Sequence, residues 1–240
     1  GELVAGVAHE VNNPLTAISA FAQILLRESD LTAMQRESIE VISSETMRAS
    51  QVVKDLLAFA RRSEPMRAPV DLNSVVQGTL RLRGYQLTST KVQVQTTLAP
   101  ELPAVIGDAR QLQQVCLNLV TNAVQAMAPH GGGELFISTS TDGADVVLAV
   151  RDTGPGIPDA VRPYVFQPFF TTKDEGEGTG LGLSVSYGIV AAHGGRIEVT
   201  NTSAAGTTFR VTLPSHRDEA DQPPASGAEA AWEGSRVPVS

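Results

Sequence analysis

The chain has 240 residues, of which 42% are hydrophobic, 18% charged and 5% aromatic. This length suits two compact units with mainly aliphatic cores. The net charge of −8 argues against a basic surface, so we expect no nucleic-acid partner. No apolar run reaches the roughly 18 residues of a membrane span. The single cysteine, Cys116, excludes an internal disulfide and a cysteine-rich metal site.

The chain begins at Gly1, without an initiator methionine or a signal-peptide pattern, and enters an amphipathic segment at once. We therefore expect a cytoplasmic fragment of a longer protein, with no membrane contact of its own. Any sensor or membrane anchor would precede it.

Two amphipathic helices are predicted first, one ending near residue 28 and one running from a turn at 29–32 to about residue 62. Apolar and small residues recur in alternating steps of three and four, the spacing of packed helices. These positions are Val4, Val7, Val11, Leu15, Ile18, Ala22 and Leu25, then Ile39, Ile42, Thr46, Ala49, Val53, Leu56 and Ala60. A lone hairpin cannot bury such a stripe, so we predict a homodimer with a four-helix bundle. The alternative is packing on the downstream domain.

A histidine lies on the far side of the first helix from this stripe. His9 and Asn13 share that side, and Glu10 adjoins His9. A lone helical histidine is ordinarily a core residue, but the periodicity places His9 in water, where its imidazole is available for chemistry. Pro14 lacks an N–H and crowds the carbonyl group of Glu10, which predicts a kink or bulge beside the histidine.

Residues 64–70 contain two prolines and are predicted to be a linker after a hairpin of residues 1–63. Beyond it, strands alternate with helices, which indicates a two-layer α/β sandwich over residues 71–213. Helices are predicted at 71–87, from 108 with Gln111 completing a capping box, and at 181–192; strands are predicted at 92–98, 134–141, 145–151, 196–201 and 207–213. The strand at 145–151 is apolar on both faces and should be interior.

Residues 214–240 are rich in Pro, Ala, Gly, Ser and acidic residues without a period, which predicts a disordered tail or a linker. Trp232 could mark a short docking segment; the alternative is a stray aromatic residue.

One carboxylate and two glycines follow the interior strand. Asp152 is placed to accept a hydrogen bond from an exocyclic amine, as on adenine, whereas guanine would present a carbonyl there. Gly154 and Gly156 let the backbone approach a flat base. The alternative is an ordinary Asp-Gly turn.

A glycine run at 176–183 opens the next helix, and its exposed N–H groups and helix N-terminus suit phosphates. It matches neither a Walker loop nor the dinucleotide fingerprint. Asn118 and Asn122, one turn apart, offer neutral oxygens to Mg²⁺, and Lys173 offers a positive charge near the phosphates. Taken singly, the amides could equally be an exposed polar edge and the lysine a solvated one.

Together these segments resemble the boxes of the GHKL, or Bergerat-fold, ATPases. The matching segments are Asn118/Asn122, 152–156, 166–170, 178–182 and 206–209. The box His9-Glu10-Val11-Asn12-Asn13-Pro14-Leu15 resembles that of two-component sensor histidine kinases, most closely the nitrogen-regulator branch, which favours asparagine between the histidine and the proline. The resemblance covers about residues 1–213.

The resemblance implies ATP-dependent autophosphorylation of His9, with Glu10 as general base, and then phosphotransfer to an aspartate in the receiver domain of a response regulator. Asn13 matches a position that orients water to dephosphorylate the regulator. The loop from about residue 157 to 180 would be a lid over ATP, with Phe166, Phe169 and Phe170 fastening it to the hairpin. Asn122 and Asn118 would bind Mg²⁺. The nucleotide-binding residues implied are Asn118, Asn122, Asp152, Gly154, Gly156, Ile157, Lys173, Gly178, Thr179, Gly180, Leu181, Gly182, Leu183 and Thr207.

Two other functions remain open. A chaperone, gyrase or mismatch-repair ATPase would lack the His-Glu hairpin, and its catalytic glutamate position is Asn118 here. The second is a non-catalytic dimerisation and signalling module that binds nucleotide without transferring phosphate; no motif residue is visibly lost here, which argues against it. The sequence does not decide whether phosphorylation occurs within or between subunits.

Overall fold

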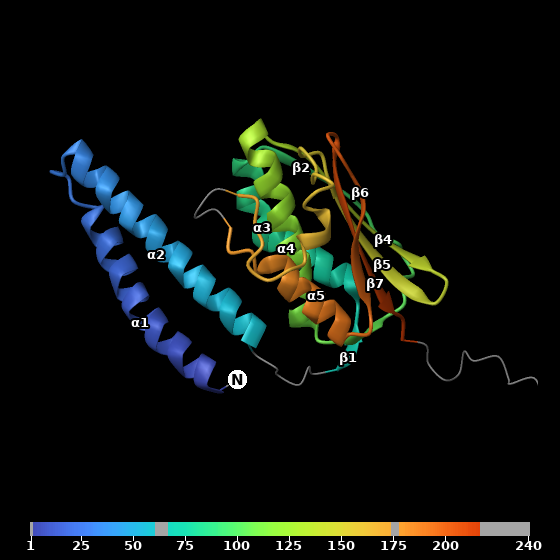
Figure 1. The fold of residues 1–240 in the computed structure, drawn as a ribbon. Helices are drawn as coiled ribbons and strands as arrows, with labels where there is room; N and C mark the ends of the chain where they lie inside the picture. The colour runs from blue at the N-terminus through green and yellow to red at the C-terminus, as the bar shows by residue number, and fades with distance from the viewer. Residues whose placement is uncertain (1, 61–66, 174–177, 217–240) are drawn as a thin grey trace, which may run out of the picture.

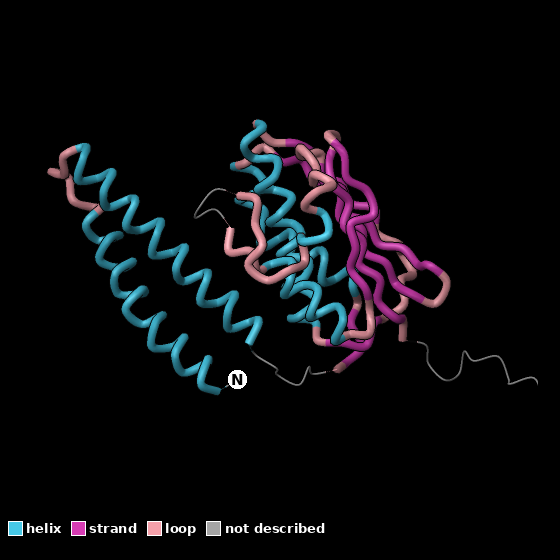
Figure 2. Tube along the Cα trace, viewed as in Figure 1, coloured by secondary structure: helices cyan, strands magenta, loops and turns pink. Residues whose placement is uncertain are grey.

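The computed structural model describes residues 2–60, 67–173 and 178–216, with the side chains of 2–10, 51 and 54–60 outside the description. A helical hairpin stands beside an α/β unit, and a layer of helices separates the hairpin from a sheet (Figure 1). Figure 2 shows the same division, with the strands gathered on one side. The expected helical hairpin followed by a two-layer α/β sandwich is therefore confirmed; the predicted tail from residue 217 on lies outside the described residues.

The hairpin consists of α1 (Glu2–Leu25) and α2 (Ala33–Ala60). Thr32 and Gln35 form a capping box at the start of α2: the Thr32 hydroxyl accepts from the Gln35 N–H at 3.2 Å, and the Gln35 amide oxygen accepts from the Thr32 N–H at 2.9 Å. Arg36 donates back to the carbonyl oxygens of Leu26 and Glu28, which lie just past the end of α1. The turn is thus held from both helices. Pro14 lies within α1, and the helix continues through it.

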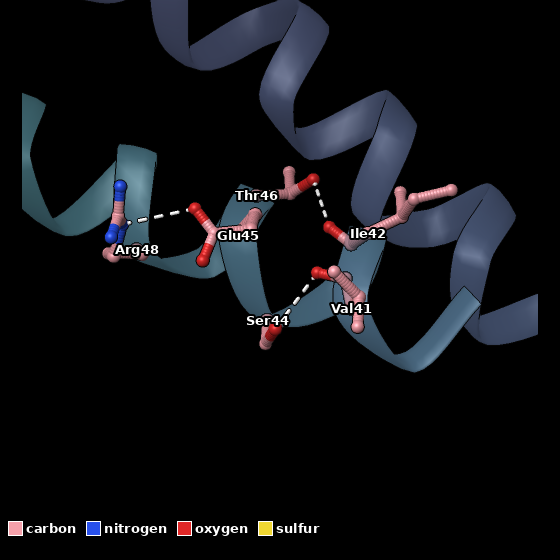
Figure 3. A network of polar contacts seen from close by, with 6 residues as sticks. All are labelled: Val41, Ile42, Ser44, Glu45, Thr46 and Arg48. Atoms are coloured by element: carbon pink, nitrogen blue, oxygen red, sulfur yellow. Dashed lines mark hydrogen bonds and ion pairs between the residues drawn. The ribbon is translucent and has the colours of Figure 1, made fainter. Parts of the chain in front are cut away.

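Small and polar side chains fill the space between α1 and α2. Ala22, Ser43 and Thr46 are buried there. Figure 3 shows that the Thr46 hydroxyl is satisfied within α2, because it donates to the carbonyl oxygen of Ile42 at 2.7 Å. In the same view, the exposed side chains of Arg48 and Glu45 form an ion pair at 3.2 Å. The interior of the hairpin therefore needs few large apolar residues.

Large apolar side chains of the hairpin remain exposed instead. Val11, Ile18 and Leu25, seven residues apart, form a row along α1, and Phe21 adjoins it. The predicted apolar stripe of α1 therefore has two parts. Ala22 is buried inside the hairpin, whereas the row of Val11, Ile18 and Leu25 lies on the surface of the single chain. Asn13 is exposed, as predicted.

The main sheet has the strand order β2-β4-β5-β7-β6, with β2 parallel to β4 and the other pairs antiparallel. Its strands are β2 (Val92–Thr97), β4 (Gly133–Asp142), β5 (Asp145–Asp152), β6 (Arg196–Ser203) and β7 (Gly206–Pro214). The strand β5, whose residues 146–150 are all apolar, is central, as predicted. One face is covered by α3 (Leu72–Ser89), α4 (Ala109–Met127) and α5 (Gly182–Ala192); short 3-10 helices lie at Ala128–His130 and Arg162–Tyr164.

A second, two-stranded sheet was not predicted. β1 (Ala68–Val70) pairs antiparallel with β3 (Val105–Gly107). Residues 68–70, expected in the linker, therefore belong to the α/β unit. Two three-residue strands carry too little alternation to be recognised before their pairing is known.

The helix α4 has the apolar face that was predicted, with Leu112, Val115, Cys116, Leu119, Ala123 and Met127 all buried. Burial raises the pKa of the Cys116 thiol to about 12, so it is inert at neutral pH. Asp108 caps the helix by accepting from the Arg110 N–H at 2.9 Å. The predicted capping box with Gln111 is wrong, because the Asp108 N–H donates to Nε2 of His193 at 3.1 Å.

The opposite face of the sheet carries ion pairs and a cation–π contact. Arg210 bonds Asp142 at 2.6 Å, Arg196 lies 3.9 Å from Asp145, and the Arg151 guanidinium lies 5.2 Å from the ring centre of Phe136. These pairs suit a face directed toward solvent.

Candidate nucleotide-binding site

Asp152 ends the central strand β5 and is only 4% exposed. Its Oδ1 accepts the N–H groups of Gly154 at 2.8 Å and Thr207 at 3.3 Å. Burial raises the pKa of this carboxyl, and those two backbone bonds oppose the rise. The carboxylate is thus oriented through one oxygen, which leaves the other to accept a hydrogen bond from a ligand amine.

Two chain segments cross closely beside this carboxylate. Gly156 has φ of 82°, and a Cβ added to it would lie 2.0 Å from the carbonyl oxygen of Ser203. A Cβ on Gly154 would lie 3.2 Å from that of Ala126 on α4. The sequence therefore needs glycine at 156 for both conformation and space. Asp152, Gly154, Gly156 and Thr207 do come together, as predicted.

The residue after this crossing is held by the edge strand. The Thr202 hydroxyl on β6 accepts from the Ile157 N–H at 2.6 Å and donates to the Ile157 carbonyl oxygen at 3.2 Å. Further along, Arg162 donates to the carbonyl oxygen of Val199, also on β6, at 2.7 Å. The edge strand thus anchors the start of the long loop at two points.

The first half of the predicted lid is packed rather than open. Val165 is buried, and the ring centre of Phe166 lies 6.4 Å from that of Phe209 and 5.8 Å from that of Tyr187. Phe170 packs 5.9 Å from Tyr164. Here Phe166 and Phe170 pack against the core of the α/β unit, so their fastening of the loop to the hairpin when the two units engage stays a prediction.

Only one of the three phenylalanines is available to another surface. Phe169 is 66% exposed and has φ of 64°, an uncommon conformation for a bulky residue. Gly180, with φ of 65°, lies against it: a Cβ at Gly180 would be 2.4 Å from the carbonyl carbon of Phe169. The backbones of Gly180 and Phe169 are therefore in close contact, which leaves no room for a side chain at position 180.

The glycine run does open a helix, as predicted. The Thr179 hydroxyl accepts from the Leu181 N–H at 3.3 Å, and Leu181 is buried at the point where α5 begins. Gly178, Gly182 and Leu183 are half-buried around the same helix N-terminus. Its first backbone N–H groups and the helix dipole favour an anion.

Amide side chains of α4 face this helix start. Asn118 donates through Nδ2 to the carbonyl oxygen of Gly182 at 2.8 Å and to the Ser186 hydroxyl at 3.1 Å, while its Oδ1 accepts from Gln114 at 2.9 Å. Asn118 therefore ties α4 to α5. Asn122 lies one turn later and is half-buried. Lys173 donates through Nζ to Gln125, further along the same helix.

The helix α1, on which His9 lies, is not part of this site in the single chain. α2 contacts α5 and lies between α1 and the α/β unit (Figure 1). The side chains of His9 and Glu10 lie outside the described residues. The nucleotide residues and the histidine helix thus form two separate parts of the candidate machinery.

Two polar residues of the site, Gln125 and Thr202, were not predicted. Neither carries a motif signal, because each hydrogen-bonds to a partner distant in the sequence. Among the described residues, no group of three or more His, Cys, Asp and Glu could hold a metal ion. No helix in the described ranges is long and apolar enough to cross a membrane.

Two family models match the chain. Residues 107–217 match the histidine kinase-, DNA gyrase B- and HSP90-like ATPases, and residues 1–65 match the His Kinase A (phospho-acceptor) domain. The sensor histidine kinase ZraS of Escherichia coli (strain K12) is 37% identical over 214 residues, covering 89% of this chain and 45% of ZraS. The sensor protein FixL of Bradyrhizobium diazoefficiens is 39% identical over 223 residues, covering 89% of this chain and 43% of FixL. The chain thus spans a little under half the length of these relatives.

Solved structures of histidine kinases are also similar to this chain. The catalytic domain of the histidine kinase ThkA is 30% identical with a TM-score of 0.56, covering 62% of this chain and 95% of that domain. Full-length ShkA in complex with AMPPNP is 28% identical with a TM-score of 0.73, covering 89% of this chain and 46% of ShkA. ThkA in complex with the response regulator protein TrrA is 28% identical with a TM-score of 0.65, covering 90% of this chain and 62% of that chain.

Proposed function

Because the chain belongs to the two-component sensor histidine kinases, we propose that it transfers the γ-phosphoryl group of ATP to His9 and then to an aspartate of a response regulator. The observation that carries the proposal is the buried Asp152, held by the N–H groups of Gly154 and Thr207 beside the glycine-flanked start of α5. A carboxylate that can recognise a base and a helix start that can bind phosphate lie in one unit, and this unit follows a hairpin whose helix α1 carries His9.

Adenine is recognised at Asp152. The free oxygen of the carboxylate accepts the exocyclic amine of adenine, whereas guanine would oppose it with a carbonyl oxygen. Thr207 and Ile157 shape the same end of the pocket, and the triphosphate extends toward Gly178–Gly182, where backbone N–H groups receive it. The residues 157–170 that pack on the core form the base of the lid, and the described residues 171–173 and 178–180 belong to its outer part.

Mg²⁺ fits this end of the site. A few neutral oxygens, completed by water and phosphate oxygens, suit this ion, and the half-buried amide of Asn122 supplies one. Asn118 holds α4 against α5 and contributes a second oxygen if Gln114 yields it. When bound, Mg²⁺ offsets negative charge on the β- and γ-phosphates.

His9 acts as the nucleophile in its neutral form, because only an unprotonated ring nitrogen has a lone pair with which to attack phosphorus. One ring nitrogen forms the bond to the γ-phosphorus, the bond to the β-phosphate oxygen breaks, and ADP leaves. Glu10 accepts the proton from the other ring nitrogen. Phosphotransfer to the regulator aspartate regenerates His9.

The functional unit is a homodimer. The exposed row of Val11, Ile18, Phe21 and Leu25 is an apolar surface that a second copy of the hairpin buries in a four-helix bundle. A receiver domain is the partner, in line with ThkA, which was solved in complex with the response regulator protein TrrA, and it docks on the same hairpin beside His9. Exposed Asn13, one turn from His9, orients water for dephosphorylation of the regulator, a second activity of the same surface.

The test is incubation with γ-labelled ATP and Mg²⁺, comparing the wild type with His9→Gln. We expect acid-labile, base-stable label on the wild type only. Equal label on both proteins contradicts His9 as acceptor. ATP binding without any label would assign the chain to the non-catalytic modules.

A further inference from the structure

The helix α4 presents a row of uncharged amides to the glycine run. Gln114, Asn118, Asn122 and Gln125 follow at intervals of four, four and three residues, which places them on one face. Asn118 bonds Gln114 at one end and the first residue of α5 at the other. The row supplies hydrogen bonds but no positive charge, so a cation that meets the triphosphate must come from another element.

Lys173 brings such a charge to the end of the row. Its Nζ donates to Oε1 of Gln125, one turn beyond Asn122. Its stem lies across the glycine run, since a Cβ added to Gly178 would be 3.2 Å from Cδ of Lys173 and 2.9 Å from the Thr171 hydroxyl. The Thr171 hydroxyl in turn accepts from the Lys173 N–H at 3.2 Å. The lysine therefore joins the outer part of the lid to α4 at the phosphate end of the site.

We propose that Gln125 is a positioning residue, which holds the ammonium group of Lys173 where the triphosphate will take it over. This inference rests on the proposed function. The alternative is an ordinary surface hydrogen bond with no bearing on nucleotide.

The neutrality of Gln125 is essential to this role. A phosphate oxygen carries a negative charge that the Gln125 amide lacks, so Coulomb attraction is added to its hydrogen bond with the ammonium group, and the phosphates outcompete the amide for Lys173. A carboxylate at position 125 would compete with the phosphates on equal terms and keep the lysine. Glutamine thus orients the charge without retaining it.

The test is a double-mutant cycle of Gln125→Glu and Lys173→Met, read by calorimetric titration with AMPPNP and with adenosine. We expect Gln125→Glu to weaken AMPPNP binding about fivefold, because the exposed pair is partly screened, and to leave adenosine binding unchanged. In the Lys173→Met background the same substitution should change AMPPNP affinity less than twofold. Gln113→Glu, the same change on another face of α4, is the matched control and should have no such effect.

Each other outcome is decisive. An equal loss in both backgrounds would mean that the carboxylate simply repels phosphate, and an equal loss for adenosine would mean that the pocket is damaged; either overturns the role of Gln125. Failure of the wild type to bind AMPPNP would overturn the proposed function instead.

Discussion

Nε2 of His193 accepts a hydrogen bond from the Asp108 N–H at 3.1 Å, and its Nδ1–H donates to the carbonyl oxygen of Ile189 at 2.8 Å. The ring is only 6% exposed and joins the C-terminus of α5 to the N-terminus of α4. These are the two helices whose other ends carry the glycine run and the amide row. The imidazole therefore fixes their relative position from the side opposite the nucleotide.

Replacing this ring should destabilise the α/β unit. His193→Ala leaves the buried Asp108 N–H without an acceptor and opens a cavity, for an expected loss of about 2–4 kcal/mol. Gly107→Ala should cost about 2 kcal/mol in the wild type, because its Cβ would lie 2.3 Å from Cδ2 of His193. Urea unfolding followed by circular dichroism measures both.

The two changes should compensate each other. With the ring gone, Gly107→Ala should cost much less, so the double mutant should be more stable than the sum of the single effects. Gly188→Ala, on the exposed side of α5 with nothing within 4 Å, is the control and should be neutral or slightly stabilising. Strict additivity of the first pair would contradict the stapling role of His193.

Asp152→Asn should weaken ATP binding and reduce the preference for ATP over GTP. If Oδ1 keeps the Gly154 and Thr207 bonds, the new amide NH₂ faces the adenine amine, donor against donor. We expect ATP affinity to fall about 100-fold and the preference for ATP over GTP to shrink, since the amide can donate to the guanine carbonyl. Competition titration with both nucleotides measures this. Undiminished ATP preference would contradict base recognition by Asp152.

The same variant should be more stable than the wild type without nucleotide at neutral pH. Burial raises the pKa of Asp152 above its ordinary value of 3.8, so the folded state holds this proton more tightly than the unfolded state. Stability of the wild type therefore falls as the pH rises from 3.8 through the raised pKa, and the asparagine variant lacks that fall. The gap between the proteins should vanish below about pH 4. Thermal unfolding from pH 3.5 to 7.5 tests it; a gap independent of pH would refute the assignment.

Adenosine should bind the wild type more weakly at low pH, whereas the unliganded protein should be more stable there. The carboxylate must be ionised to accept the adenine amine, so affinity should decline as the pH falls through the raised pKa of Asp152. Adenosine is the ligand of choice because it has no phosphate to titrate. Affinity that stays level from pH 7 down to pH 3.8 would contradict the prediction.

Local pattern was enough to predict most elements and the motif residues, because periodicity and glycine spacing are properties of neighbouring residues. The central strand β5 and the apolar face of α4 were predicted in this way, whereas the meeting of Thr207 with Asp152 was expected only from the family resemblance. The β1–β3 pair, the His193–Asp108 bond and the packing of Phe166 on Phe209 were not predicted. Each joins segments far apart in the sequence, so only the folded chain reveals it. The resemblance to the nitrogen-regulator branch stays a prediction.

The Thr202 hydroxyl should govern nucleotide affinity through Ile157. Thr202→Val removes both of its bonds to the Ile157 backbone while keeping the shape, for an expected loss of about 1–2 kcal/mol in the binding of ATP analogues. Thr202→Ser should restore affinity. Thr200→Val, at the irregularity in the pairing of β6 with β7, is the control and should change affinity little. Amide exchange at Ile157 should quicken in the valine variant alone, and equal weakening by serine and valine would refute the hydroxyl's role.

The exposed row on α1 should hold the dimer together. Ile18 is 45% exposed and belongs to the row with Val11 and Leu25, whereas Ile24 is 55% exposed and projects about 120° away. Ile18→Glu would bury an unpaired carboxylate between two hairpins, so we expect the dimer dissociation constant to rise at least about 100-fold. Ile24→Glu should leave the dimer intact, because its side chain stays in water. Sedimentation velocity over a range of concentrations distinguishes the two, and equal dissociation by both variants would contradict the assignment of the interface to this row.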